Sequence, residues 1–234
     1  MSLFTSMTTE GMEEQRDTLG GFSLLESGIY PATIRVAYAG RSQSGAMNIT
    51  LLADIEGKEY RETVYITNRN GENFFSDKND GKKKPLPGFT IINDLCQIAC
   101  DKPLNVIEPE TKTLKVYSPE LQKEVPTQVP VIMDLLNKKV NLAIVKEKRF
   151  KMQNSDKGYV ETDEIRESNA IQKVFDFDTK QTVYEIKHGV SETPLFYDKW
   201  KEKNDGVVVD KTRKGHSQQT PSVPQKTERK SLFS

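Results

Sequence analysis

With 234 residues the chain is long enough for one large domain with appended segments, and its 34 basic and 34 acidic residues leave no formal net charge. This balance excludes nucleic-acid binding through overall charge alone, so any such affinity must come from where the cations are placed. The sequence shows neither a basic-apolar leader nor an apolar run near the roughly 20 residues of a membrane span, which predicts a soluble cytoplasmic protein without membrane partners.

Composition divides the chain into three parts. Residues 1–24 are polar and mostly acidic, and they are expected to form a flexible N-terminal arm. Residues 25–205 carry the periodic apolar pattern of a folded domain, with a proline-rich insertion at 103–130. Residues 206–234 are polar and basic, and they are predicted to be a disordered tail because they offer too little apolar surface to order themselves.

Three consecutive strands are predicted between Gly28 and Asn68. They are separated by glycine-containing turns, the pattern of an antiparallel meander. In the third strand Tyr60, Val64 and Ile66 are expected to pack on one face, because side chains alternate along a strand. Its opposite face then carries a cation beside an aromatic ring, formed by Arg61, Thr63 and Tyr65. Arg35 is expected to join this face and Tyr38 to point into the core.

One amphipathic helix follows the meander. Apolar residues recur at helical spacing between Pro85 and Asp101, where Cys96 and Cys100 are expected to be core residues. The stretch 69–84 between meander and helix is predicted to be a loop, because it is rich in turn-forming residues. The insertion at 103–130 is predicted to be extended on the surface, with one strand at 113–117.

The second half of the sequence contains patterns that predict two further strands and several short helices. A short helix at 130–137 precedes a long strand at 139–152, and a fifth strand runs through 171–177. The charged stretch between them is compatible with strand or loop. Thr182 and Glu185 have capping-box spacing, and a last helix at 194–203 places Trp200 on its packing face.

This order predicts a mainly β protein with an OB-fold, a five-stranded Greek-key barrel carrying a helix between strands three and four, with extra short helices. An unrelated β-barrel or an α+β sandwich has the same element order. The meander, the helix through Cys96 and residues 129–140 resemble the OB-fold single-stranded DNA-binding proteins of tailed bacteriophages, over residues 25–190.

The resemblance implies a function. It implies a protein that coats and protects single-stranded DNA, without sequence specificity, during phage DNA replication or recombination in the cytoplasm of an infected bacterium. Replication or recombination proteins would then be partners through the C-terminal tail. Many proteins of this functional class end in an acidic tail with a terminal aromatic residue, whereas this tail is basic, although Phe233 lies near its end.

Cations interleaved with aromatic rings are the expected DNA contacts, because cations track phosphates and rings stack bases. The strand at 139–152 ends in such a cluster beside a turn. The alternative without DNA binding is that each of these groups is a solvent-exposed run of charges whose aromatic residues anchor it to the domain. The complete predicted DNA-binding set is Arg35, Arg61, Thr63, Tyr65, Arg69, Phe74, Lys82, Lys83, Lys84, Lys148, Arg149, Phe150, Lys151 and Tyr159.

Catalysis has little support in the sequence, so a protein without enzymatic activity, metal, cofactor or small-molecule substrate is predicted. His188 and His216 are far apart, and no glycine-rich phosphate loop is present. A metal-dependent nuclease would need converging acids, which only the charged stretch at 161–167 could supply. The other alternative is an OB-fold module that binds proteins of a replication complex through the insertion and tail, without contacting DNA.

Overall fold

The computed structural model describes residues 24–118, 121–155 and 158–212. Within them the fold is mainly β, as predicted, and is built on an eight-stranded sheet with a separate two-stranded sheet and short helices. Strands β1 (Gly28–Arg41), β2 (Met47–Ile55) and β3 (Lys58–Tyr65) form the expected antiparallel meander. The turn between β2 and β3 has positive φ at Glu56 and Gly57, the geometry that a tight hairpin requires.

The two longest strands extend the sheet from β1. β8 (Lys139–Ser155) pairs with β1 from Gly28↔Ile144 to Thr33↔Lys139, and its distal half forms a hairpin with β9 (Gly158–Asp176). We call residues 146–168 the β8/β9 arm. The charged stretch that the sequence left open is therefore strand, because it completes the ladder of the basic strand β8.

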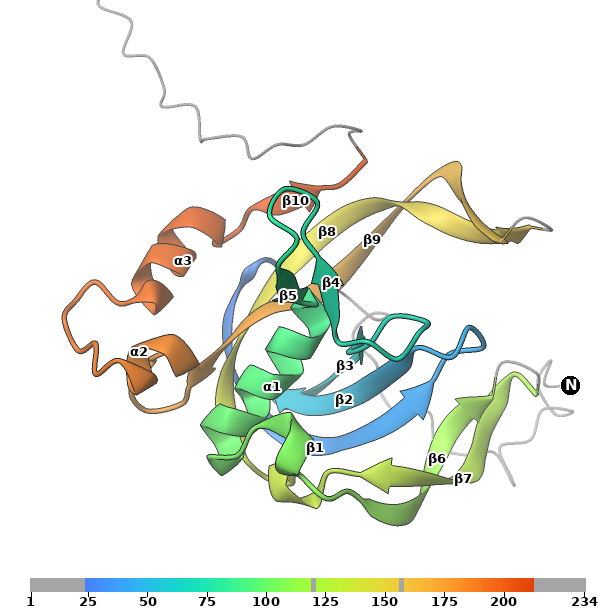
Figure 1. Cartoon of the computed structure of the whole chain (residues 1–234), viewed down its shortest axis with the longest axis horizontal. Helices are drawn as coiled ribbons and strands as arrows, with labels where there is room; N and C mark the ends of the chain where they lie inside the picture. Colours follow the sequence, from blue (N-terminus) through green and yellow to red (C-terminus); the bar gives the residue numbers. More distant parts are fainter. Residues whose placement is uncertain (1–23, 119–120, 156–157, 213–234) are drawn as a thin grey trace, which may run out of the picture.

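The insertion is a second hairpin rather than an extended surface segment. Strands β6 (Glu110–Ser118) and β7 (Lys123–Val131) pair along their whole length, and β7 joins β1 at Tyr38↔Val131. The single-turn 3₁₀ helices η1 (Leu104–Val106) and η2 (Met133–Leu135) flank it, and η2 replaces the predicted helix at 130–137. Figure 1 shows this hairpin and the β8/β9 arm reaching out on the same side of the molecule, with the meander between them.

The main core lies between the meander and the amphipathic helix α1 (Pro87–Cys100), as predicted. Ile92, Leu95 and Cys96 of α1 are fully buried against apolar residues of β1, β2, β3, β8 and β9. The helix begins very close to β3, because a Cβ placed on Gly88 would lie 2.1 Å from the carbonyl oxygen of Tyr65. Glycine at this position thus lets α1 pack on the end of β3.

Smaller elements complete the domain. The predicted loop at 69–84 contains a short hairpin of β4 (Phe74–Ser76) and β5 (Lys83–Pro85). Helix α2 (Val183–Lys187) has the predicted capping box from Thr182 to Glu185. Helix α3 (Phe196–Asn204) buries Trp200 against Ala143, Val145 and Phe175, so this tryptophan is a packing residue, as expected.

Two expectations about the barrel and the tail are corrected. The sheet path ends at β3, and within the described ranges no ladder joins β3 to β9, so the five-stranded barrel is not closed. Among the described residues, one hydrogen bond joins β3 to β9: the Ile171 N–H donates to the side-chain Oε2 of Glu62 at 2.9 Å. In addition, β10 (Val208–Asp210) pairs in parallel with β8, so the sheet continues into the segment predicted as tail.

Candidate nucleic-acid interface

The meander face that points away from α1 is organised in rows across the three strands. Residues directly opposite each other in an antiparallel ladder share a face, so the register assigns each row. We call this surface the outer face. Its three central rows are Gly40–Asn48–Tyr65, Tyr38–Thr50–Thr63 and Val36–Leu52–Arg61.

Tyr38 is buried in an apolar cluster, as predicted, but it lies on the outer face rather than on the face toward α1. The β1–β2 register shifts between Ile34 and Val36, which marks a bulge at Arg35 that reverses the alternation beyond it. The Tyr38 hydroxyl accepts a hydrogen bond from Arg61 Nη2 at 3.1 Å. The bulge therefore adds a tyrosine to the same face as the predicted cation and fixes the direction of that cation.

The β6/β7 hairpin covers part of the outer face. Tyr38 packs with Val129 and Val131 of β7 in a second apolar cluster, whose partly buried members are Val36, Leu52, Leu114, Val116 and Met133. The β1 and β2 part of the face is thus largely occupied by the insertion. The β3 part remains accessible, since Arg61 and Thr63 are exposed and Tyr65 is 53% exposed.

Arg35 is held at the edge of this surface by an ion pair. Its Nη2 lies 2.7 Å from Asp54 Oδ2, and the hydrogen bond from Arg35 lowers the pKa of that carboxyl. Arg61 differs from Arg35, because its hydrogen-bond partner is the neutral hydroxyl of Tyr38. Of the two arginines, Arg61 is the one with an uncompensated charge among the described contacts.

The predicted flap is a hairpin whose cations have local partners. Lys83 Nζ lies 4.2 Å from the ring centroid of Phe74, Lys84 pairs with Asp77, and Lys82 lies 3.9 Å from Asp80. Arg69 is exposed before this hairpin. The structure brings these residues together with one another, but no described contact joins them to Arg61 or Tyr65.

The arm also neutralises most of its predicted cations. Lys148 lies 3.3 Å from Glu167, and Lys151 lies 2.9 Å from Glu164. Phe150 is half-buried opposite Ile165. Tyr159 occupies β9 opposite Asn154, and its side chain falls outside the described part of the chain.

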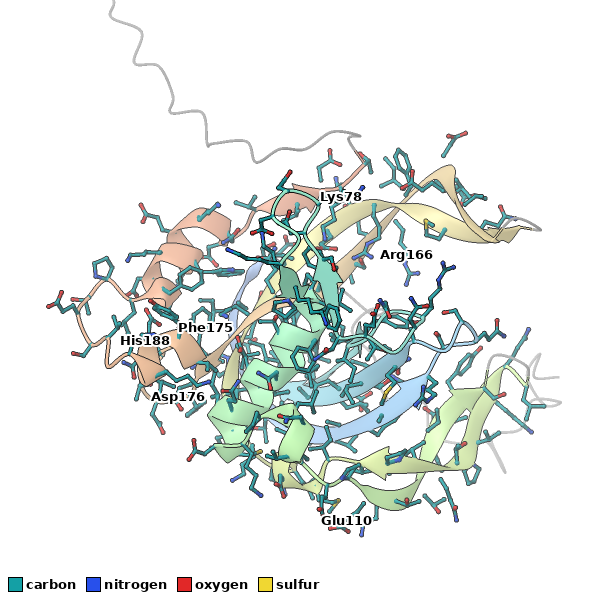
Figure 2. The ribbon with its side chains drawn as sticks, viewed as in Figure 1. Lys78, Glu110, Arg166, Phe175, Asp176 and His188 are labelled. Carbon is teal, nitrogen blue, oxygen red and sulfur yellow. The ribbon has the colours of Figure 1, made fainter. Side chains whose placement is uncertain are left out.

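Arg149 belongs to a different arrangement at the base of the arm. Both Arg149 and Lys211 form ion pairs with Glu147, whose side chain is 2% exposed. Arg166 stands directly opposite Arg149 in the β8–β9 register. Figure 2 shows the Arg166 side chain below the arm ribbon, on the side of the meander.

A second acid, which is half-buried, links β3 to β9. Glu62 of β3 accepts hydrogen bonds from the Tyr60 hydroxyl at 2.5 Å and from the Ile171 N–H. Burial raises the pKa of Glu62, and the charge of Glu147 contributes in the same direction. Burial also raises the pKa of Tyr60, so the tyrosine stays a hydrogen-bond donor to Glu62.

Comparison with known proteins does not identify a family. No protein-family model matches the chain, and no curated protein matches its sequence.

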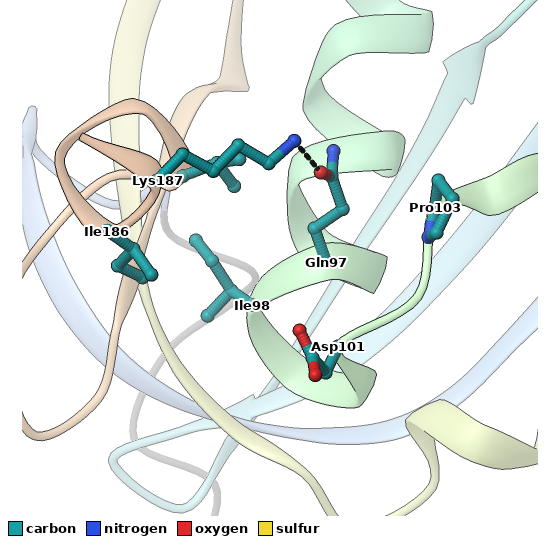
Figure 3. Close-up of a pocket in the computed structure, with 7 residues that line it drawn as sticks. Gln97, Ile98, Asp101, Pro103, Ile186 and Lys187 are labelled. Carbon is teal, nitrogen blue, oxygen red and sulfur yellow. Dashed lines mark hydrogen bonds between the residues drawn. The ribbon is translucent and has the colours of Figure 1, made fainter. Parts of the chain in front are cut away.

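Two cavities of the described structure lie away from the predicted DNA-binding residues. A cavity of about 360 Å³ between α1 and α2 is lined by residues that include Ile98, Pro103 and Ile186, and the Lys187 ammonium donates to Gln97 at its rim (Figure 3). A second hollow of about 410 Å³ lies between α2 and α3 and is lined in part by Tyr184 and Phe196. None of the predicted DNA-binding residues lines either hollow.

Within the described ranges, no three acidic, cysteine or histidine side chains are grouped as a metal site would require, and no helix is long and apolar enough to cross a membrane. Cys96 is buried, as expected, and burial raises the pKa of its thiol to about 12. The acids at 161–167, the only candidates for a nuclease site, include Glu164 and Glu167, which pair with lysines of β8.

Sequence reasoning missed three residues of this surface. Tyr38 was misplaced because a bulge leaves no clear mark in the apolar pattern. Arg166 was passed over because the stretch around it was not assigned to a strand; pairing that stretch with the basic strand would have placed an arginine opposite Arg149. Lys211 was counted as tail, although Val207, Val208 and Val209 before it are a short β-branched run that favours a strand.

Proposed function

We propose that this protein binds single-stranded DNA without sequence specificity and coats it during phage DNA replication or recombination. The observation that carries the proposal is the exposed edge of the outer face, where Arg61, Thr63 and Tyr65 stand at successive same-face positions of β3. Arg61 supplies a cation for a phosphate, and Tyr65 supplies a ring for a base. Stacking on such a ring tolerates any base, because every base has a π-face.

We also propose that the domain is an OB-fold with an incompletely closed barrel. Three features support this: the meander, the position of α1 between β3 and the long β8–β9 pair, and the pairing of β1 with both β2 and β8. Oligonucleotides bind OB-folds across the central strands and between loops that frame them. On this assignment β3 is strand three of the OB-fold, whose face with strand two binds oligonucleotides, and the β8/β9 arm is one framing loop.

Binding would proceed without catalysis. DNA would lie along β3, with its phosphates toward Arg61 and toward the cations of the arm, and with bases against Tyr65. Neutralising phosphates releases condensed counterions, so the logarithm of the affinity should fall by about 0.7 per phosphate contact for each unit of log salt on single strands. Affinity should consequently be high at low salt and decline steeply as salt is added.

A salt titration of oligonucleotide binding tests this proposal. The full chain is mixed with fluorescently labelled, unstructured oligonucleotides of several base compositions, and anisotropy is measured from low to high salt. Binding to all compositions with a steep salt slope is the expected result. Absence of binding at low salt would refute the proposal, and strong preference for one composition would refute its lack of specificity.

The second candidate is an OB-fold module that binds a protein of the replication complex without contacting DNA. It is favoured by β6, which is paired on one side only and exposes Tyr117 on the hairpin surface turned away from the outer face. Replacing Lys115 and Tyr117 by alanine leaves the packed residues of this hairpin intact. Loss of a partner in pull-downs with this variant, together with no DNA binding by the wild type, would favour the module.

A further inference from the structure

The base of the β8/β9 arm holds more positive than negative charge around one buried acid. Glu147 is 2% exposed and pairs with two cations, whereas Arg149 and Lys211 are 47% and 51% exposed. Arg166 shares the face of Arg149, since the two stand opposite each other in the ladder, and no ion pair of Arg166 is found within the described ranges. Two cations therefore pair with one carboxylate, a third stands across the ladder from Arg149, and all three keep much of their surface in solvent.

The lysines around these three cations already form ion pairs with acids. Lys146 lies 2.9 Å from Glu26 and 3.7 Å from Glu167, Lys148 shares Glu167, and Lys151 pairs with Glu164. Two acids of the arm, Glu164 and Glu167, are thus engaged by other lysines. The cations beside Glu147 are Arg149 and Lys211, and Arg166 stands opposite Arg149 in the ladder.

The backbone fixes Lys211 in this position. β10 pairs with Lys146–Lys148 of β8, and the Lys211 N–H donates to the Lys148 carbonyl at 2.8 Å. Lys211 can therefore neutralise Glu147 by itself when Arg149 turns toward an anion. This matters because a buried carboxylate left without a partner is strongly unfavourable. A guanidinium has five N–H donors, so Arg149 can bind an anion while it still contacts Glu147.

We propose that Arg149, Arg166 and Lys211 form a binding site for backbone phosphates of single-stranded DNA, with Glu147 as the residue that positions Arg149 and Lys211. This inference rests on the proposed function and adds a site to it at the base of the arm. The three cations hold the phosphates, and Glu147 restricts the directions of two of those cations.

Four variants of the full chain test the site in the same anisotropy titration. Lys211→Met should weaken binding about fivefold at 0.1 M salt and lower the salt slope by about 0.7, the values for one lost phosphate contact. Lys211→Arg should keep both. Glu147→Gln adds one positive unit to the protein yet should weaken binding, because the two cations lose their anchor. Lys187→Met, which removes the same charge from α2, is the control and should change neither quantity.

The outcomes separate the two proposals. If the wild type does not bind at low salt, the proposed function itself fails. If the wild type binds but Lys211→Met matches Lys187→Met in affinity and slope, or Glu147→Gln binds more tightly, the site is refuted. Thermal unfolding of each variant shows whether it is folded. Should Glu147→Gln unfold, the Lys211→Met and Lys211→Arg pair still decides, because the side chain of Lys211 is half exposed and its backbone contact is unaffected.

Discussion

Tyr65 is the residue whose side chain most directly tests base stacking. Replacing Tyr65 by alanine should weaken oligonucleotide binding by roughly 1–3 kcal/mol, the range for loss of one stacked base, whereas Tyr65→Phe should bind like the wild type. Tyr117→Ala is a matched control, because Tyr117 is similarly exposed, at 49% against 53%, but lies on the far surface of β6. Equal effects of Tyr65→Ala and Tyr117→Ala would argue against stacking on β3.

Glu62 should make the free energy of unfolding fall as pH rises, whereas a carboxylate in a surface ion pair makes it rise. Burial raises the pKa of its carboxyl above the ordinary 4.5, so the folded state holds this proton more tightly than the unfolded state does. Its contribution to the free energy of unfolding is then present at low pH and is lost as pH rises through the folded pKa.

Urea unfolding of the wild type and of Glu62→Gln, from about pH 4 to about pH 8, checks this dependence. Glutamine does not titrate, so the free energy of unfolding of the wild type should fall relative to that of the variant as pH rises. A difference that grows with pH would mean that hydrogen bonds and Arg149, rather than burial, control the pKa of Glu62.

At the scale of the element, the close packing of α1 on β3 predicts that Gly88→Ala lowers stability, whereas helix propensity alone predicts that it raises stability. Gly88→Ala should gain up to about 1 kcal/mol if propensity alone mattered. The new Cβ would, however, lie 2.1 Å from the Tyr65 carbonyl oxygen, so α1 must move and roughly 1–3 kcal/mol of stability should be lost.

Thermal unfolding measures this loss. Gly28→Ala is the milder comparison, because its Cβ would meet only the Tyr30 ring at 3.3 Å. A Gly88→Ala variant that is more stable than the wild type would contradict the close packing of α1 on β3.

Some elements are predictable from local pattern, and others depend on their partners. The meander and α1 are predicted by the spacing of apolar residues in the sequence, because each of these elements buries one continuous apolar face. The β6/β7 hairpin does not, since Pro126 and Pro130 suggest a broken chain. Ile132 donates to the Ala37 carbonyl of β1, and N–H groups alternate between edges, so both prolines face the edge away from β6. They therefore remove no hydrogen bond from the β6–β7 ladder.

The same dependence on partners limits what the sequence says of the site. Arg61, Thr63 and Tyr65 could be assigned to one face, because alternation within a single strand is sufficient. The place of Tyr38, the covering of the outer face by β7 and the pairing of Lys211 with Glu147 all require contacts between distant segments. The pattern within one β-strand therefore assigns residues to a face of the sheet, but it does not show which part of that face other elements cover.

At the scale of the whole molecule, the folded domain should extend beyond residue 205, because β10 pairs with β8. A chain shortened to residue 212 keeps every contact described above and serves as the reference. A chain shortened to 206 loses the β10 ladder, the 2.5 Å hydrogen bond from Ser27 Oγ to the Val207 carbonyl and the packing of Val209 beside Trp200.

The shorter chain also leaves Glu147 with Arg149 as its one remaining ion-pair partner among the described residues. Weakening a buried ion pair costs several kcal/mol, and in a domain of this size each kcal/mol corresponds to about 2–4 °C, so the melting temperature should fall by roughly 5–15 °C. Calorimetry of the two shortened chains measures the difference. Equal melting temperatures would show that β10 and Lys211 add nothing to the fold, and that the domain ends where sequence composition places its boundary.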